Sequence, residues 1–124
     1  MTIGPDIGLT NALAAVVTTT HEEVPLAQLT DWQWDELIIF VEGARASDIN
    51  AAAGQEVMHD KYLYNRTLLL FMDGGSFARG VTTYIGFSFA PDDTRQFTNE
   101  VRVVPVQSNS GGWNLRLLEP GDNQ

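Results

Sequence analysis

The chain has 124 residues, of which 44% are hydrophobic, 10% aromatic and 19% charged, a composition typical of an ordinary globular domain. It contains no cysteine, which excludes disulfides, zinc–thiolate sites and cysteine nucleophiles. Seven Lys and Arg against sixteen Asp and Glu give a net charge of −9, which disfavours direct contact with nucleic-acid phosphates. We therefore expect a single domain over residues 1–124, cytoplasmic and without a membrane segment.

The negative charge is concentrated in the first half of the chain. Residues 1–60 hold ten acids and one base, whereas residues 61–124 hold six acids and six bases. Such a one-sided field favours a basic partner, because complementary charge speeds encounter and discriminates among partners. Plain solubility is the alternative explanation for the same surplus.

The first half predicts two helices and a strand. Leu9, Leu13 and Val16 recur at helical spacing, and Asp6 is placed to cap the helix that carries them. The apolar run at residues 37–41 predicts a buried central strand. Ser47 is the expected N-cap of a short helix over residues 48–53, which ends at Gly54.

The second half switches to the two-residue period of strands. We expect strands over residues 68–72, 77–89, 97–104 and 113–117, with turns at 73–75, 91–93 and 108–112. The predicted fold class is α+β, with an antiparallel sheet of about five strands that includes a C-terminal four-strand meander. The N-terminal helix and the short helix are expected to pack on one face of this sheet.

No residue set carries a catalytic signature. Glu56 and His59 have the spacing of a ligand pair on a helix, but a carboxylate-bridged metal site needs a second such pair, so a surface pair in a loop is expected. His21, Glu22 and Glu23 are read as a solvated cluster at a helix end. The serines lack a Gly-x-Ser-x-Gly elbow. We expect no catalytic residues, no metal and no cofactor.

The most unusual stretch is the pair of tryptophans at Trp32 and Trp34, which acids surround. In one interpretation Trp34 anchors the core at the entry to the strand, and the other tryptophan is exposed as an aromatic contact point inside an acidic rim; the sequence leaves open which of the two is exposed. The first strand and the short helix should bring the acids of this half into one contiguous surface. The predicted partner-binding residues are Asp31, Trp32, Asp35, Glu36, Glu42, Asp48, Glu56 and Asp60.

Several of these features together give the chain a resemblance to a known pattern. A Trp34-Asp35 pair precedes the strand at 37–41, the helix from Ser47 ends at Gly54, and a hairpin spans 68–77. This arrangement resembles a loose group of small bacterial proteins, many of them uncharacterised or derived from lipoproteins. In charge and size the chain also resembles the immunity proteins that neutralise bacterial toxins. These resemblances imply an α+β fold and, for the second, a protein partner.

The leading functional hypothesis is a non-catalytic inhibitor or immunity-type protein that masks a basic partner such as a toxin domain. It predicts no contact with nucleic acid or membrane, and a monomer or a weak dimer paired through an edge strand. One alternative is a structural domain of the cell envelope, derived from a secreted or lipidated precursor. A small hydrolase that uses paired carboxylates is the third possibility.

Overall fold

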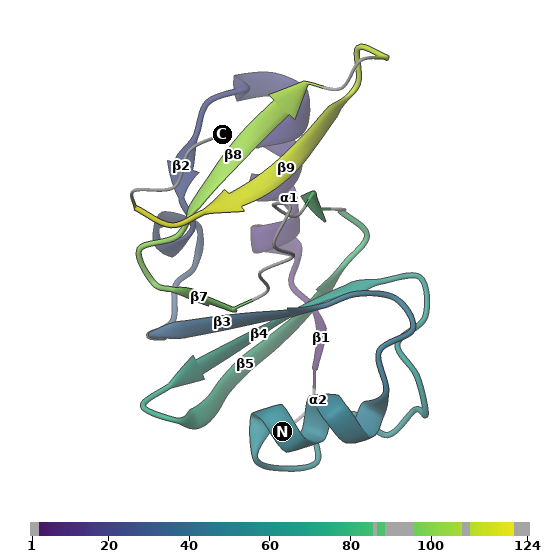
Figure 1. Cartoon of the computed structure of the whole chain (residues 1–124). Coiled ribbons are helices and arrows are strands. Elements are labelled where there is room, and N and C mark those ends of the chain that lie inside the picture. The colour runs from purple at the N-terminus through teal and green to yellow at the C-terminus, as the bar shows by residue number, and fades with distance from the viewer. Residues whose placement is uncertain (1–2, 86, 89–95, 108–109, 121–124) are drawn as a thin grey trace.

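The computed structural model describes residues 3–85, 87–88, 96–107 and 110–120 (Figure 1). Its elements, in chain order, are β1 (Gly4–Pro5), α1 (Ile7–Ala15), a π-helical turn (Val16–Thr20), β2 (Val24–Pro25), a 3-10 turn (Leu26–Leu29), β3 (Glu36–Phe40), α2 (Ala46–Ala53), β4 (Thr67–Asp73), β5 (Ser76–Thr83), β6 (Phe87–Ser88), β7 (Gln96–Thr98), β8 (Arg102–Gln107) and β9 (Trp113–Leu118).

The described strands β1, β5, β4, β3 and β7 form one sheet, in that order. β3 is paired with β4 on one edge and with β7 on the other, which confirms the expected central strand. A two-residue turn at Gly74 and Gly75 joins β4 to β5, with φ of 61° and 84°. Positive φ at both positions is what a tight hairpin needs, so the predicted turn is confirmed.

This sheet is covered on both faces, because alternate residues of β4 enter two different cores. Leu69 and Phe71 pack in a cluster with α1, whereas Leu68 and Leu70 pack in a cluster with Ile49 of α2. In Figure 1, α2 lies below the sheet and α1 above it. The expectation that both helices share one face is therefore wrong. An unbroken apolar run such as LLLFM at 68–72 makes both faces of a strand hydrophobic, and each face needs a cover.

A second sheet covers α1 from the other side. Its described strands have the order β2, β8, β9 and β6, with β8 and β9 in an antiparallel hairpin. Leu13 of α1 is fully buried in the same cluster as Val103 and Leu115 of this sheet. Helix α1 is thus held between two sheets.

The strands expected at 77–89 and 97–104 each divide between the two sheets. β5 ends at Thr83 and the chain resumes as β6, which pairs with β9; likewise β7 belongs to the first sheet and β8 to the second. The expected meander of four strands in one sheet is corrected accordingly. Alternation records which face a residue occupies but not which strand lies beside it. The expected turn at 91–93 lies outside the described residues, as do residues 86 and 89 of the expected strand and residues 108–109 of the expected turn.

The predicted N-cap is correct for helix α1 and wrong for helix α2. The Asp6 carboxylate accepts a hydrogen bond from the Leu9 amide at 2.8 Å, which confirms the predicted cap of α1. Helix α2 begins at Ala46, so Ser47 is not its N-cap. The start is displaced because Arg45 bridges to Tyr62 and the Ala46 amide donates to the Lys61 carbonyl. Gly54 ends the helix with a φ of 77°, as expected.

The fold class is α+β with antiparallel sheets, as predicted; short parallel pairs join β1 to β5 and β6 to β9. Within the described ranges, no helix is long and apolar enough to cross a membrane.

Candidate functional site

Two of the predicted acids, Asp35 and Glu36, line a groove of about 660 Å³ at the start of β3. Glu36 is paired with Met72 of β4 on one side and with Thr98 of β7 on the other, so the sheet itself sets its neighbours. We call this the acidic groove; it is lined by Asp35, Glu36, Gly74, Gly75, Gln96, Phe97, Thr98 and Glu119. Its described lining therefore holds three carboxylates and no Lys or Arg.

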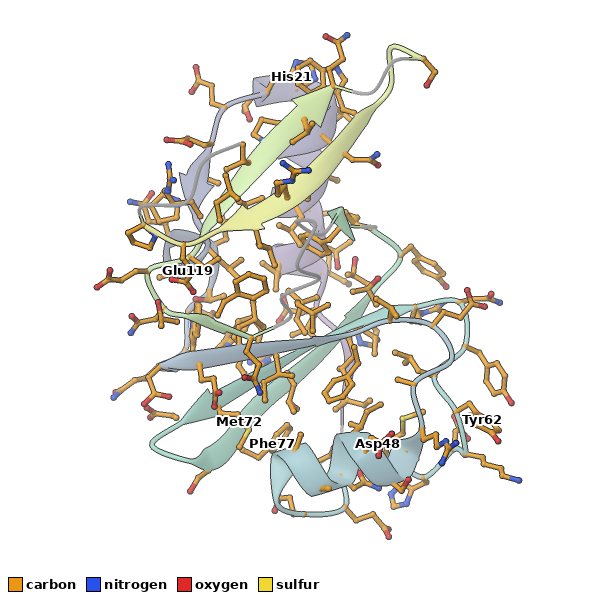
Figure 2. All side chains as sticks on the ribbon, in the orientation of Figure 1. His21, Asp48, Tyr62, Met72, Phe77 and Glu119 are labelled. Carbon is orange, nitrogen blue, oxygen red and sulfur yellow. The ribbon has the colours of Figure 1, made fainter. Side chains whose placement is uncertain are left out.

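Hydrogen bonds hold two of these carboxylates in place. Asp35 accepts from the Gly74 amide at 3.1 Å, while its own amide donates to the Met72 carbonyl at 2.9 Å. Glu119 accepts from both the amide and the hydroxyl of Thr98, and Figure 2 shows it beside β7. Asp35 is exposed and Glu36 is half-buried. The groove thus presents negative charge from positions that the backbone fixes.

The two tryptophans take different positions from one another. Trp34 is 4% exposed and its indole N–H donates to the Thr30 hydroxyl at 2.9 Å, which confirms it as a core anchor. Trp32 is half-buried, with its ring edge-on to Phe71 at 5.1 Å between centroids. The Arg79 guanidinium lies 4.5 Å from the centre of the Trp32 ring. The chain's own cation therefore occupies the place expected for a cation of a partner.

The remaining predicted acids lie elsewhere. Asp31 is exposed and precedes the two tryptophans in the chain. β3 has five residues and is about 17 Å long at 3.3 Å per residue, and Glu42 follows the end of this strand that is far from the acidic groove. Figure 2 shows Asp48 on α2, below the sheet. Glu56 and Asp60 line a second groove together with Arg45 and Lys61, so their charge is locally balanced. The structure brings Asp35 and Glu36 into one site and leaves the other five predicted acids outside its lining.

Sequence reasoning missed a larger groove of about 880 Å³. It lies between residues 3–11, residues 57–66 and the end of β5, and all three tyrosines of the sequence, Tyr62, Tyr64 and Tyr84, line it. We call it the tyrosine groove. The only sequence signal was the alternation of tyrosines in KYLYNR at 61–66, because the other walls come from distant segments.

The histidines have partners but no ligand cluster. His59 Nδ1 lies 3.0 Å from Glu56 Oε1, and both side chains are 70% exposed, which confirms the expected surface pair. His21 stacks on Trp113 with centroids 4.1 Å apart, and Glu23 pairs with Arg102 at 2.8 Å, so this predicted solvated cluster is anchored to the second sheet. Within the part of the chain that the structure describes, no three His, Asp or Glu side chains gather as metal ligands do.

Comparisons with protein-family models, with curated proteins and with solved structures found no match to this chain. The resemblances to small bacterial proteins and to immunity proteins accordingly stay predictions.

Proposed function

We propose that this chain is a protein-binding module whose acidic groove engages a basic segment of a partner protein. The observation that carries the proposal is that Asp35 and Glu36, at the start of β3, line one groove together with the Gly74–Gly75 turn and β7. The net charge of −9 supplies a long-range attraction for the same kind of partner.

The groove suits a cationic side chain for an electrostatic reason. Asp35 and Glu36 bring two adjacent negative charges to this groove, and a Lys or Arg side chain of a partner placed there would gain charge-assisted hydrogen bonds to them. The hairpin turn at Gly74 and Gly75 forms one wall without side chains, so a partner backbone can approach closely there. Electrostatic steering of this kind raises the association rate more than the intrinsic affinity.

An inhibitor or immunity-type role is the narrower form of this proposal. In that role the acidic groove covers a basic surface of a toxin domain, and the carboxylates take the place of the anionic groups that such a surface binds. The acidic charge and the small size of the chain support this form.

The proposal is tested by mapping where a basic peptide binds. A decamer of alternating lysine and alanine is titrated into the isotope-labelled chain while the amide resonances are followed by NMR. We expect saturable shifts concentrated at residues 35–36, 74–75 and 96–98. These shifts should weaken as salt is added, since the Debye length is only about 10 Å at 0.1 M ionic strength.

A glutamate–alanine decamer of the same length is the matched control and should shift none of these resonances. Shifts spread evenly over every exposed acid, including Glu42 and Asp48, would contradict the proposal, because they would show attraction to the overall charge and no defined site.

A further inference from the structure

The tyrosine groove holds the large exposed hydrophobic side chains of the part of the chain that the structure describes. Among the described residues, the large hydrophobic side chains that remain exposed are Ile7 (77%), Tyr64 (63%) and Tyr84 (74%), and all three line this groove. Exposed hydrophobic side chains are normally scattered singly over a protein surface. Here three of them, from distant segments of the chain, line one groove. Contiguous exposed apolar surface of this kind is typical of interaction sites.

Neighbouring groups hold the tyrosine rings in position. The Arg66 guanidinium lies 3.6 Å from the centre of the Tyr84 ring, and the rings of Tyr62 and Tyr64 meet edge-on with centroids 6.3 Å apart. Figure 2 shows Tyr62 on the segment beyond α2, on the opposite side of the view from Glu119. Tyrosine offers a large rigid contact area at a low cost in side-chain entropy, so rings held in this way form an ordered wall.

The charge of this groove differs from that of the molecule. Asp6 is paired with Arg79 at 2.7 Å, which leaves Asp60 and Arg66 as the remaining Asp, Glu, Lys and Arg side chains among the described lining residues. The groove is therefore close to neutral on a chain with a net charge of −9. A ligand without net charge therefore suits this near-neutral groove, whereas the basic segment proposed for the acidic groove does not.

The chemistry of the walls favours a peptide over a carbohydrate. Ile3, Pro5, Ile7 and Met58 offer aliphatic contacts that suit apolar side chains, whereas sugar hydroxyls need a dense set of polar partners. The Asp6 carboxylate, which could serve a hydroxyl, already accepts from Leu9 and Arg79. Tyrosine hydroxyls instead provide donors for the unpaired carbonyls of an extended chain.

We propose that the tyrosine groove binds an uncharged, proline-rich segment of a partner polypeptide in the extended polyproline II conformation. Proline rings pack against exposed aromatic rings, and this conformation leaves its carbonyls free to accept hydrogen bonds. Because the segment is already extended, little conformational entropy is lost on binding. This site is independent of the acidic groove, because the two grooves have different linings and one takes an uncharged segment while the other takes a basic one.

The probe for this site is a proline decamer, titrated into the isotope-labelled chain under NMR. We expect saturable shifts at the amides of residues 62–66 and 82–85, with little dependence on salt. A glycine–serine decamer of equal length is the matched control and should produce no saturable shift. The joint substitution Tyr64→Ala and Tyr84→Ala should weaken binding of the proline decamer at least tenfold, with the remaining amide spectrum showing that the fold is retained.

The joint substitution Tyr64→Phe and Tyr84→Phe keeps the rings and should lose much less affinity, which separates ring contact from loss of structure. Three results would overturn the inference: no shift at these residues with the proline decamer, equal binding by the alanine variant, or shifts at the same residues when the free protein is merely concentrated. The last would assign the groove to contact between two copies of this chain. Tight binding of a neutral oligosaccharide there in place of the peptide would overturn it as well.

Discussion

Arg79 connects two residues that the sequence keeps far apart. Its guanidinium pairs with Asp6 at 2.7 Å and lies over the ring of Trp32 at 4.5 Å. The local half of this arrangement, in which Asp6 caps α1, could be predicted because a cap and its amide lie within one turn. The other half could not, since the pairing of a β5 side chain with Asp6 and Trp32 depends on how the sheet places α1 and β3.

These contacts give Trp32 a role in stability. Replacing Trp32 with alanine should lower the free energy of unfolding by about 2 kcal/mol, below the roughly 3–5 kcal/mol of a fully buried aromatic because the ring is half-buried. Chemical denaturation measures the change, with exposed Gln33→Ala as the neighbouring control. Affinity for the lysine–alanine decamer should stay within about twofold. A Trp32→Ala chain that stayed stable but no longer bound the peptide would instead make Trp32 an interface anchor.

At the scale of whole elements, the sequence predicts best those features that depend on residues close together in the chain. The cap at Asp6, the glycine turn of the β4–β5 hairpin and the helix exit at Gly54 all follow from short-range chemistry and were predictable. The breaks after Thr83 and Thr98 were not, because each moves the chain from one sheet to the other without disturbing the alternation. The apolar run at 68–72 did carry a signal for two covered faces.

Gly80 of β5 lies directly against Ile3. A Cβ at this position would lie 2.2 Å from Cγ2 of Ile3, on the segment that leads into β1. Gly80→Ala should therefore push this segment off β5 and lower the free energy of unfolding by about 1–3 kcal/mol. Thermal or chemical denaturation measures the loss, with exposed Ser76→Ala on the same strand as the control.

A second substitution tests the cause of that loss. Adding Ile3→Ala to the Gly80→Ala chain removes the Cγ2 atom that the new methyl meets, so the double variant should be more stable than the sum of the single effects predicts. Strict additivity would show that the two residues do not collide and that the cost of Gly80→Ala lies elsewhere.

For the molecule as a whole, the sequence shows that the first half of the chain is acidic, but it does not show which of these acids share one surface. Asp35 and Glu36 were expected to act together because they adjoin one another, and the acidic groove does contain both. Glu119 joins them only because β9 ends beside β7, which no local pattern reports. Glu42, Asp48, Glu56 and Asp60 were grouped with them on nearness in sequence, yet the length of β3 and the position of α2 below the sheet separate them.

The central claim is that a basic partner recognises the acidic groove and not the net charge, and two charge-matched variants test it. Asp35→Lys with Glu36→Lys changes the groove, whereas Glu22→Lys with Glu42→Lys raises the net charge equally at exposed positions outside it. The measurement is the dissociation constant of the lysine–alanine decamer, at low and high salt, for both variants and the unchanged chain. We predict a loss of about tenfold or more at low salt for the groove variant and about twofold for the other, whose distant charges are screened. Equal losses for the two variants would contradict the account.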